Sequence, residues 1–368
     1  MSALNRDAVL EALAQVEDPA FHKPMLELGT LLDVVVEAAS VRASVRLSAP
    51  SDELQMTIRE RIHAALKPLG VDQVILEWDL QVPTRDVGQE DPIPQVRNVL
   101  LVMSGKGGVG KSTTAVNLAL SLKRSGARVG LLDADIYGPS IPTMLGIQGF
   151  PSSEDGKTIE PLERFGVKLM SIGFLMEDTK AAIVWRGPML HGALQQFLQD
   201  VRWGELDYLV VDLPPGTGDV ALSLAQKMKV TGAIIVTTPQ EVALQDVYKG
   251  VSMCEKLNIS VLGVVENMSF FIDSAGVKHH LFGEGGGKRV AEFAKAPLLG
   301  EIPLEPKVRE WGDNGTPVVQ ALPQSESAQA FARIADRVTE IIARRHFERH
   351  GGAKAPSTSG PRRLKIVR

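Results

Sequence analysis

The sequence GKGGVGKST, residues 105–113, decides the fold of most of this chain. It follows an apolar run at 98–103 and precedes a helical pattern, so it fits the motif G-x-x-x-x-G-K-[ST] in the strand-to-helix context that the motif requires. Glycines let backbone N–H groups converge on phosphate oxygens, and the helix N-terminus adds partial positive charge. An ordinary glycine-rich turn would explain the glycines, but not the lysine and the two hydroxyls at these offsets.

The side chains of this loop predict a site for ATP with Mg²⁺. Lys111 is expected to reach the β- and γ-phosphates, and Ser112 is expected to bind Mg²⁺. The residues of the loop expected to contact the nucleotide are Gly105, Lys106, Gly107, Gly108, Val109, Gly110, Lys111, Ser112 and Thr113.

Four more apolar runs follow, separated by helical patterns, at 129–132, 208–211, 233–236 and 261–265. Runs without polar alternation suit strands that are covered on both faces, and helices between them imply a parallel sheet of βαβ units. The predicted fold class is therefore α/β, a doubly wound and mainly parallel sheet with a P-loop, preceded by a small α/β domain.

Acidic residues end two of these runs, where open α/β sheets bind ligands. Asp212 ends the run at 208–211 and is expected to hold Mg²⁺, as a Walker B aspartate does. Asp135 is the candidate to orient the attacking water, and Asp133 is expected to support the metal. Either of these two could instead cap the next helix. The PPGTG run at 214–218 is either a simple turn or a loop whose amides sense a γ-phosphate.

The residues before the P-loop predict a second, smaller domain with helices at 4–16 and 52–66 and strands at 31–36, 41–47 and 74–78. The polar segment TRDVGQEDPIPQ contains two prolines and is typical of a linker. The expected organisation is a small α/β domain at 1–83, a linker at 84–96, a P-loop ATPase domain at 97–348 and a flexible basic tail at 349–368.

Composition limits how the chain could bind nucleic acid, a membrane or a metal. Forty basic and forty-four acidic residues give a net charge of -4, so no overall field attracts nucleic acid or an anionic membrane. The start lacks a signal-peptide core and no later run is long enough to span a bilayer, so we expect a cytoplasmic protein. The single cysteine, Cys254, excludes an intrachain disulfide and any metal site that needs several thiolates from one chain.

The early lysine of the loop, Lys106, makes it resemble the deviant Walker A of the MinD/ParA-like superfamily of ATPases. This resemblance implies a homodimer in which Lys106 reaches across to the partner's phosphates and acts like an arginine finger. The alternative is a solvent-facing lysine. Lys106, Lys111 and Asp135 are thus the predicted catalytic residues.

Further blocks narrow the resemblance to the Mrp/ApbC family: WRGPM at 185–189, WGELDYLVVDLPPGTGDVALSL at 203–224, GVVENMSFF at 263–271 and LFGEGGG at 281–287. The resemblance, over roughly 97–342, implies a dimeric ATPase that carries or assembles iron-sulfur clusters for apo-protein clients. It also implies that Asn267 contacts the adenine, a turn-forming Asn being the alternative. The first domain resembles, through VEDP at 16–19, the small domain linked to iron-sulfur assembly in this family.

One element of the family pattern is missing. After ENMS the family typically has a C-x-x-C pair, so that two chains supply four thiolates to a shared cluster, but FFIDSAGVKHHLFG at 270–283 has no cysteine. The cysteine often found in the first domain is also replaced, by SAPSDEL at 48–54. Cys254 is expected to be buried in a helix, and two copies fall short of the four ligands that a cluster usually takes. Asp273, His279 and His280 could contribute oxygen or nitrogen ligands, but polar residues on an exposed loop are the simpler explanation, so no iron-sulfur ligands are identifiable.

Three functions fit these observations. The first is an ATPase in iron-sulfur cluster delivery or assembly, acting through a partner that supplies the ligands. The second is a positioning ATPase like MinD or ParA, although the final RRLKIVR is too short for a stable amphipathic anchor. The third is a nucleotide-gated adaptor whose first domain docks clients.

Overall fold

The computed structural model describes residues 4–37, 40–135, 138–175, 187–216 and 219–350. The described residues form two compact units: the first contains those up to Pro83 and those from Thr339 to His350, and the second contains those between Thr84 and Val338. Among the described residues, no helix is long and apolar enough to cross a bilayer.

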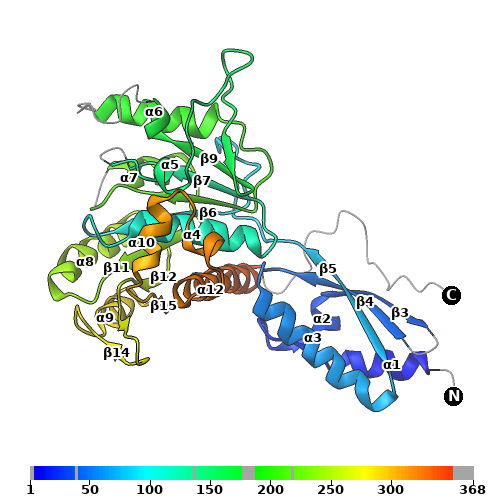
Figure 1. Ribbon diagram of the computed structural model, residues 1–368. Coiled ribbons are helices and arrows are strands. Elements are labelled where there is room, and N and C mark those ends of the chain that lie inside the picture. The colour runs from blue at the N-terminus through cyan, green and yellow to red at the C-terminus, as the bar shows by residue number, and fades with distance from the viewer. Residues whose placement is uncertain (1–3, 38–39, 136–137, 176–186, 217–218, 351–368) are drawn as a thin grey trace. The chain divides into compact units, whose positions relative to one another are not determined.

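A three-stranded sheet with helices packed on it forms the first unit (Figure 1). Its elements are α1 (Arg6–Ala14), β1 (Glu17–Asp18), β2 (Lys23–Pro24), α2 (Met25–Leu28), β3 (Leu31–Glu37), β4 (Ser40–Leu47), α3 (Asp52–Leu66), a 3-10 turn (Lys67–Leu69) and β5 (Gln73–Leu80). The middle strand, β4, pairs antiparallel with β3 and parallel with β5. This is the small α/β unit that the sequence predicts before the P-loop.

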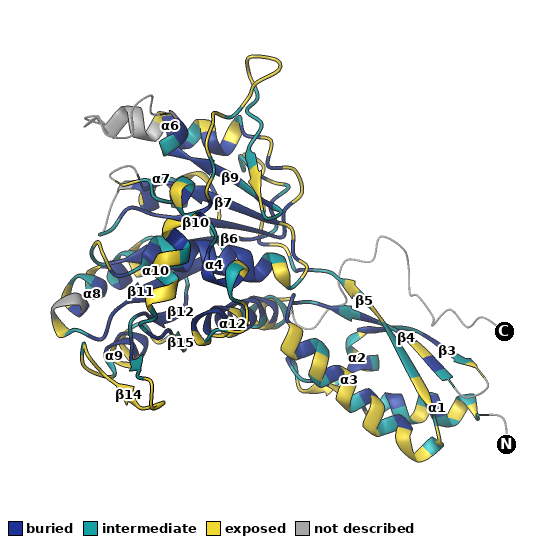
Figure 2. Cartoon of the chain, in the orientation of Figure 1, coloured by how far each residue is buried: buried dark blue, intermediate teal, exposed yellow. Residues whose placement is uncertain are grey.

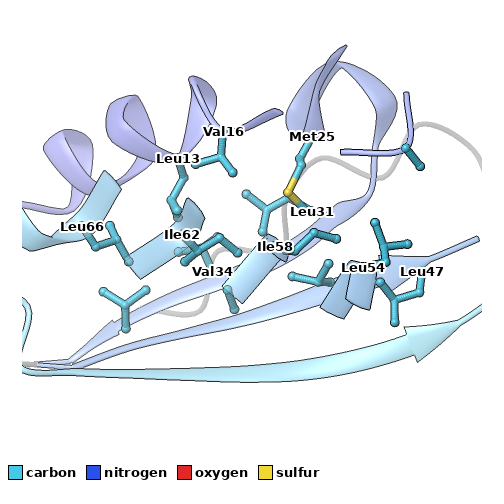
Figure 3. Packing of buried hydrophobic residues seen from close by; sticks show 14 of the residues in the cluster. Leu13, Val16, Met25, Leu31, Val34, Leu47, Leu54, Ile58, Ile62 and Leu66 are labelled. Atoms are coloured by element: carbon cyan, nitrogen blue, oxygen red, sulfur yellow. The ribbon is translucent and has the colours of Figure 1, made fainter. Parts of the chain in front are cut away.

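The core of the first unit is formed by residues of α1, α2 and α3 and of the sheet (Figure 3). Helix α3 buries Leu54, Ile58, Ile62 and Leu66, spaced four residues apart. Burial of each such side chain contributes about 1.5–3 kcal/mol. Ser51 caps this helix, because its Oγ accepts the N–H of Leu54 at 3.0 Å.

The second unit is built on an eight-stranded sheet flanked by helices (Figure 1). Its elements are β6 (Val99–Ser104), α4 (Lys111–Arg124), β7 (Val129–Asp133), α5 (Ile141–Met144), β8 (Leu162–Arg164), β9 (Val167–Ser171), a 3-10 turn (Ile172–Leu175), α6 (Gly187–Gln199), β10 (Tyr208–Asp212), α7 (Asp219–Lys227), β11 (Gly232–Thr237), α8 (Glu241–Lys256), β12 (Val261–Glu266), β13 (Phe271–Ile272), β14 (Lys278–His279), α9 (Gly286–Phe293), β15 (Leu298–Glu301), α10 (Pro306–Asp313), α11 (Val318–Ala321) and α12 (Glu326–Arg349).

The strand order is β15-β12-β11-β6-β10-β7-β9-β8, and every neighbouring pair is parallel except β8 with β9. The five strands predicted from apolar runs are β6, β7, β10, β11 and β12, which lie together at the centre and are buried on both faces (Figure 2). The predicted α/β fold class is therefore confirmed. The first strand of this unit, β6, leads into the P-loop from the middle of the sheet.

The segment expected to be a linker, 84–96, packs against the second unit. Arg85 and Asp91 form a buried ion pair, and the Arg85 guanidinium also donates to the carbonyl oxygens of Ile93 and Lys229 at 3.0 and 3.3 Å. A buried charge needs such partners because it has left water. Two of the charged residues that make this segment look like a linker therefore form a buried contact.

The last helix, α12, contributes to both cores. Ile334 is buried in the second unit, where a side chain in place of Gly300 would collide with it, whereas Ala343 belongs to the core of the first unit. The Phe347 ring lies 4.9 Å from the ring of Phe21. The expected domain range 97–348 assigned this helix up to Glu348 to the ATPase domain, but the part from Thr339 belongs to the first unit.

Candidate functional site

The loop of residues 105–110 joins the end of β6 to the first turn of α4, as the motif requires. Gly110 adopts a left-handed conformation with φ of 85°, and a Cβ there would lie 2.1 Å from Nδ2 of Asn267. A Cβ on Gly105 would lie 2.4 Å from the backbone nitrogen of Val247 in α8. Glycine is therefore required at both positions, and the backbone N–H groups of the loop remain close to the start of α4.

Lys111 brings together the side chains predicted from three separate segments. Its Nζ lies 2.7 Å from Oδ1 of Asp212, 3.2 Å from Oδ2 of Asp135 and 3.3 Å from Oγ of Ser112. The lysine is only 6% exposed, so these charge-assisted contacts form in a largely water-free place. The structure thus gathers the P-loop lysine, its hydroxyl neighbour and two of the three acidic candidates in one site.

Asp133 occupies a different place in this cluster. Its carboxylate accepts hydrogen bonds from Ser171 Oγ at 2.9 Å, from the Asp135 N–H at 3.2 Å and from the Ile141 N–H at 3.4 Å. Burial and the nearby Asp212 carboxylate raise the pKa of Asp133. Both of its oxygens bond to the chain and one contact reaches the start of α5, which favours the capping alternative over direct metal contact.

The donor set fits a magnesium ion. Asp212 Oδ2 and Asp135 Oδ1 are buried without a hydrogen-bond partner among the described residues. Burial raises the pKa of Asp212, and the neighbouring Lys111 opposes this effect. Mg²⁺ prefers hard oxygen ligands and is commonly held by one or two carboxylates together with substrate phosphates. The unpaired oxygens and the Ser112 hydroxyl are donors of this kind.

Asn267 lies against the P-loop. It follows β12, is 7% exposed, and its Nδ2 donates to the carbonyl oxygen of Val109 at 2.9 Å. Lys106 is half-buried, and its carbonyl oxygen accepts from Ser104 Oγ at 3.0 Å. In the PPGTG run, Gly216 donates its N–H to Ser104 O at 2.9 Å, while Thr217 and Gly218 lie outside the described residues, as do the first two residues of WRGPM.

The segment where the family resemblance led us to expect a C-x-x-C pair contains a small hairpin made by β13 and β14. Asp273 accepts the N–H groups of Ala275 and Val277, both at 2.9 Å, and its other oxygen lies 2.7 Å from His279 Nε2. The hydrogen bond to His279 lowers the pKa of Asp273. His280 Nδ1 lies 3.2 Å from Ser269 O. These polar side chains therefore stabilise the hairpin itself.

The only cysteine is buried as expected. Cys254 is fully buried in α8, and its Sγ lies 3.6 Å from Sδ of Met103. Burial raises the pKa of the Cys254 thiol to about 11, so the thiol is protonated at neutral pH. Within the residues that the structure describes, no group of three or more His, Cys, Asp or Glu side chains could hold a metal ion.

Two residues with clear roles were not singled out from the sequence. Ser171 holds Asp133, but it ends β9, a strand that has no apolar run to mark it. Glu266 is 1% exposed, and its carboxylate accepts from Ser269 Oγ and from the N–H of Gly287. Its place in the ENMS block, next to Asn267, was a usable signal.

A parallel sheet with a phosphate-binding loop at the start of α4, a buried lysine and carboxylates at the ends of the neighbouring strands defines a P-loop nucleoside triphosphatase. Residues 95–339 match the family described as NUBPL iron-transfer P-loop NTPase, and residues 6–75 match the family described as iron-sulfur cluster assembly protein. The chain belongs to this family of iron-transfer P-loop NTPases.

Known proteins resemble the chain over most of its length. The iron-sulfur cluster carrier protein of Synechocystis is 45% identical over 348 residues, which cover 92% of this chain and 98% of the relative. The structure of a nucleotide-binding protein from Archaeoglobus fulgidus, in complex with ADP, has a TM-score of 0.56 and 39% identity, covering 65% of this chain and 94% of that chain. The cell division ATPase MinD of Pyrococcus furiosus has a TM-score of 0.51 and 21% identity over 66% and 99% of the two chains, and shares the fold.

Proposed function

We propose that this chain binds ATP with Mg²⁺, hydrolyses ATP as a homodimer and acts in iron-sulfur cluster assembly, while a partner protein supplies the ligands of the cluster. The contact of Lys111 with Asp212 and Asp135, beside unpaired carboxylate oxygens, carries the first part. The family match over 95–339 and the name of the Synechocystis relative support the second. The proposal that a partner supplies the cluster ligands is supported by the protonated thiol of Cys254 and by the hydrogen bond between Asp273 and His279 within the hairpin.

The binding step follows from charge. Lys111 neutralises two carboxylates, and a triphosphate carries more negative charge than either of them. ATP therefore draws the ammonium toward its β- and γ-phosphates, and the carboxylates of Asp212 and Asp135 become available. Asp212 and Ser112 would hold Mg²⁺, which neutralises phosphate charge when bound. Asp133 supports this site by fixing the backbone of Asp135.

The hydrolytic step uses Asp135 and Lys106. Asp135 orients a water molecule whose oxygen forms a bond to the γ-phosphorus. The bond from that phosphorus to the bridging oxygen of ADP breaks, and both protons of the water leave with the phosphate as H₂PO₄⁻. Lys106 of the partner subunit stabilises the charge that builds on the transferring group. The amide oxygen of Asn267 contacts the adenine while its NH₂ group holds the loop.

Reconstitution tests the part played by the cluster. We expect the wild-type protein, treated anaerobically with iron and sulfide, to retain substoichiometric iron that a chelator removes rapidly, because a cluster needs about four soft ligands. Cys254→Ala is expected to change neither iron retention nor ATP affinity. Iron, sulfide and visible absorption are measured after gel filtration.

A positive control uses the hairpin. Ser274→Cys combined with Val277→Cys places an exposed thiol pair at C-x-x-C spacing without touching Asp273, and we expect it to retain more iron. A stable cluster near one per dimer in the wild type, lost in His279→Ala or Cys254→Ala, would contradict the proposal of partner ligands. That result would indicate that the chain itself carries the cluster, with unusual ligands.

A further inference from the structure

The loop between β12 and α9 is closed at its base by one buried carboxylate. Glu266, the last residue of β12, accepts a hydrogen bond from Ser269 Oγ at one end of the loop and from the N–H of Gly287 at the other. A Cβ on Gly287 would lie 2.7 Å from Cβ of Glu266, so the two segments are in close contact. Since Glu266 is 1% exposed, losing it would leave both donors without this partner in a buried place.

The residue next to Glu266 reaches the P-loop. Nδ2 of Asn267 donates to the carbonyl oxygen of Val109. The peptide that carries this carbonyl also carries the N–H of Gly110, and the two groups of a planar trans peptide point in opposite directions. By holding the Val109 oxygen on its own side, Asn267 directs the Gly110 N–H away from itself. In a P-loop the phosphates bind on that side.

The hairpin follows directly from the base of this loop at Ser269 and Phe270. The N–H of Ser269 donates to Ile302 O at 3.0 Å, and Phe270 O accepts from Leu304 at 2.7 Å, after which the chain leaves the body of the unit. The residues of the hairpin are mostly exposed around β14 (Figure 2), with Val277 at 51% and Leu281 at 60%. The hairpin is thus fixed to the unit mainly through the segment that Glu266 holds.

We propose that Glu266 is a positioning residue that acts through Asn267, orienting the Gly110 N–H toward the phosphates and linking the hairpin to the nucleotide state. Glu266 and Asn267 are consecutive, so a tilt of the peptide between Val109 and Gly110 on phosphate binding displaces the base of the hairpin. The exposed hairpin then differs between nucleotide states. This inference rests on the proposed binding of ATP.

Hydrogen exchange of the backbone tests the link. In the wild type, ADP or a non-hydrolysable ATP analogue with Mg²⁺ is expected to slow exchange in residues 268–285 several-fold. In Glu266→Ala the same segment is expected to exchange about 10-fold faster without nucleotide and to lose its response, while nucleotide affinity falls by about 10-fold. Glu266→Gln keeps an acceptor for Gly287 and should restore much of the response.

Two further variants keep the test decisive. Glu301→Ala removes an exposed glutamate at the end of the neighbouring strand β15 and is expected to behave like the wild type. If Glu266→Ala does not fold, Ser269→Ala removes one of the two hydrogen bonds and should show the same change to a smaller extent.

The inference is wrong if nucleotide binds, as calorimetry would show, yet leaves wild-type exchange in 268–285 unchanged. It is also wrong if Glu266→Ala keeps the full response. Absence of nucleotide binding in the wild type would instead refute the proposed function, and this inference with it.

Discussion

Replacing Lys111 with alanine is expected to weaken ATP binding roughly 100-fold or more, since charge-assisted hydrogen bonds contribute about 1.5–3 kcal/mol each and this ammonium serves two phosphates. The variant also leaves the carboxylates of Asp212 and Asp135 facing the incoming phosphates without a counter-charge. Isothermal titration with ATP and Mg²⁺ measures the effect.

The matched control for this prediction is Arg124→Ala, which removes an exposed basic side chain from the last turn of the same helix, α4. We expect its ATP affinity to equal that of the wild type. Circular dichroism establishes that both variants fold. Unchanged ATP affinity in a folded Lys111→Ala protein would show that the loop does not bind the phosphates.

Replacing Lys106 with alanine is expected to lower ATP turnover roughly 10³-fold while ATP affinity remains close to that of the wild type, because a cation supplied across a dimer acts mainly on the transition state. Turnover is measured as phosphate release, and affinity by titration. A large loss of affinity in this variant would place Lys106 on the phosphates of its own subunit instead.

Mixing two variants distinguishes a Lys106 that acts on the partner's phosphates from one that acts on those of its own subunit. A dimer of one Lys106→Ala chain and one Asp135→Ala chain has one intact composite site if Lys106 acts in trans, and none if it acts in cis. Random mixing should therefore recover about a quarter of wild-type turnover from two inactive parents. Turnover that stays at the level of the parents, although mixed dimers are shown to form, would exclude the trans role.

The sequence predicts the central strands of the fold well because their burial is visible in their own residues. The strands β6, β7, β10, β11 and β12 are buried on both faces, and this burial requires continuous apolar runs that are visible without a structure. The strands β9 and β15 lie toward the edges of the sheet, and they are short or contain a lysine, as Lys168 in β9 does. Their identity depends on pairing with neighbours that are distant in the chain.

Contacts between distant segments explain the remaining differences. The ion pair of Arg85 and Asp91 is buried, yet both residues lie in a polar stretch typical of linkers. The apolar stripe of α12 predicts a buried helix, but helical periodicity does not tell which core receives Ala343.

The candidate site was predictable where a motif fixes the spacing and was not where partners come from elsewhere in the chain. Lys111, Ser112, Asp135 and Asp212 meet because their motifs end adjacent strands of one parallel sheet. The role of Asp133 depends on Ser171, a residue of a strand that the sequence pattern does not reveal.

Phosphate release from ATP, measured with iron-free protein, most directly tests whether the chain is an ATP hydrolase that does not depend on a cluster of its own. The protein is chelated anaerobically, returned to Mg²⁺ and assayed beside Lys111→Ala as the inactive reference. We predict turnover well above that reference and equal to that of the protein before chelation. No turnover above the Lys111→Ala reference, in wild-type protein that is folded and dimeric, would contradict the proposal.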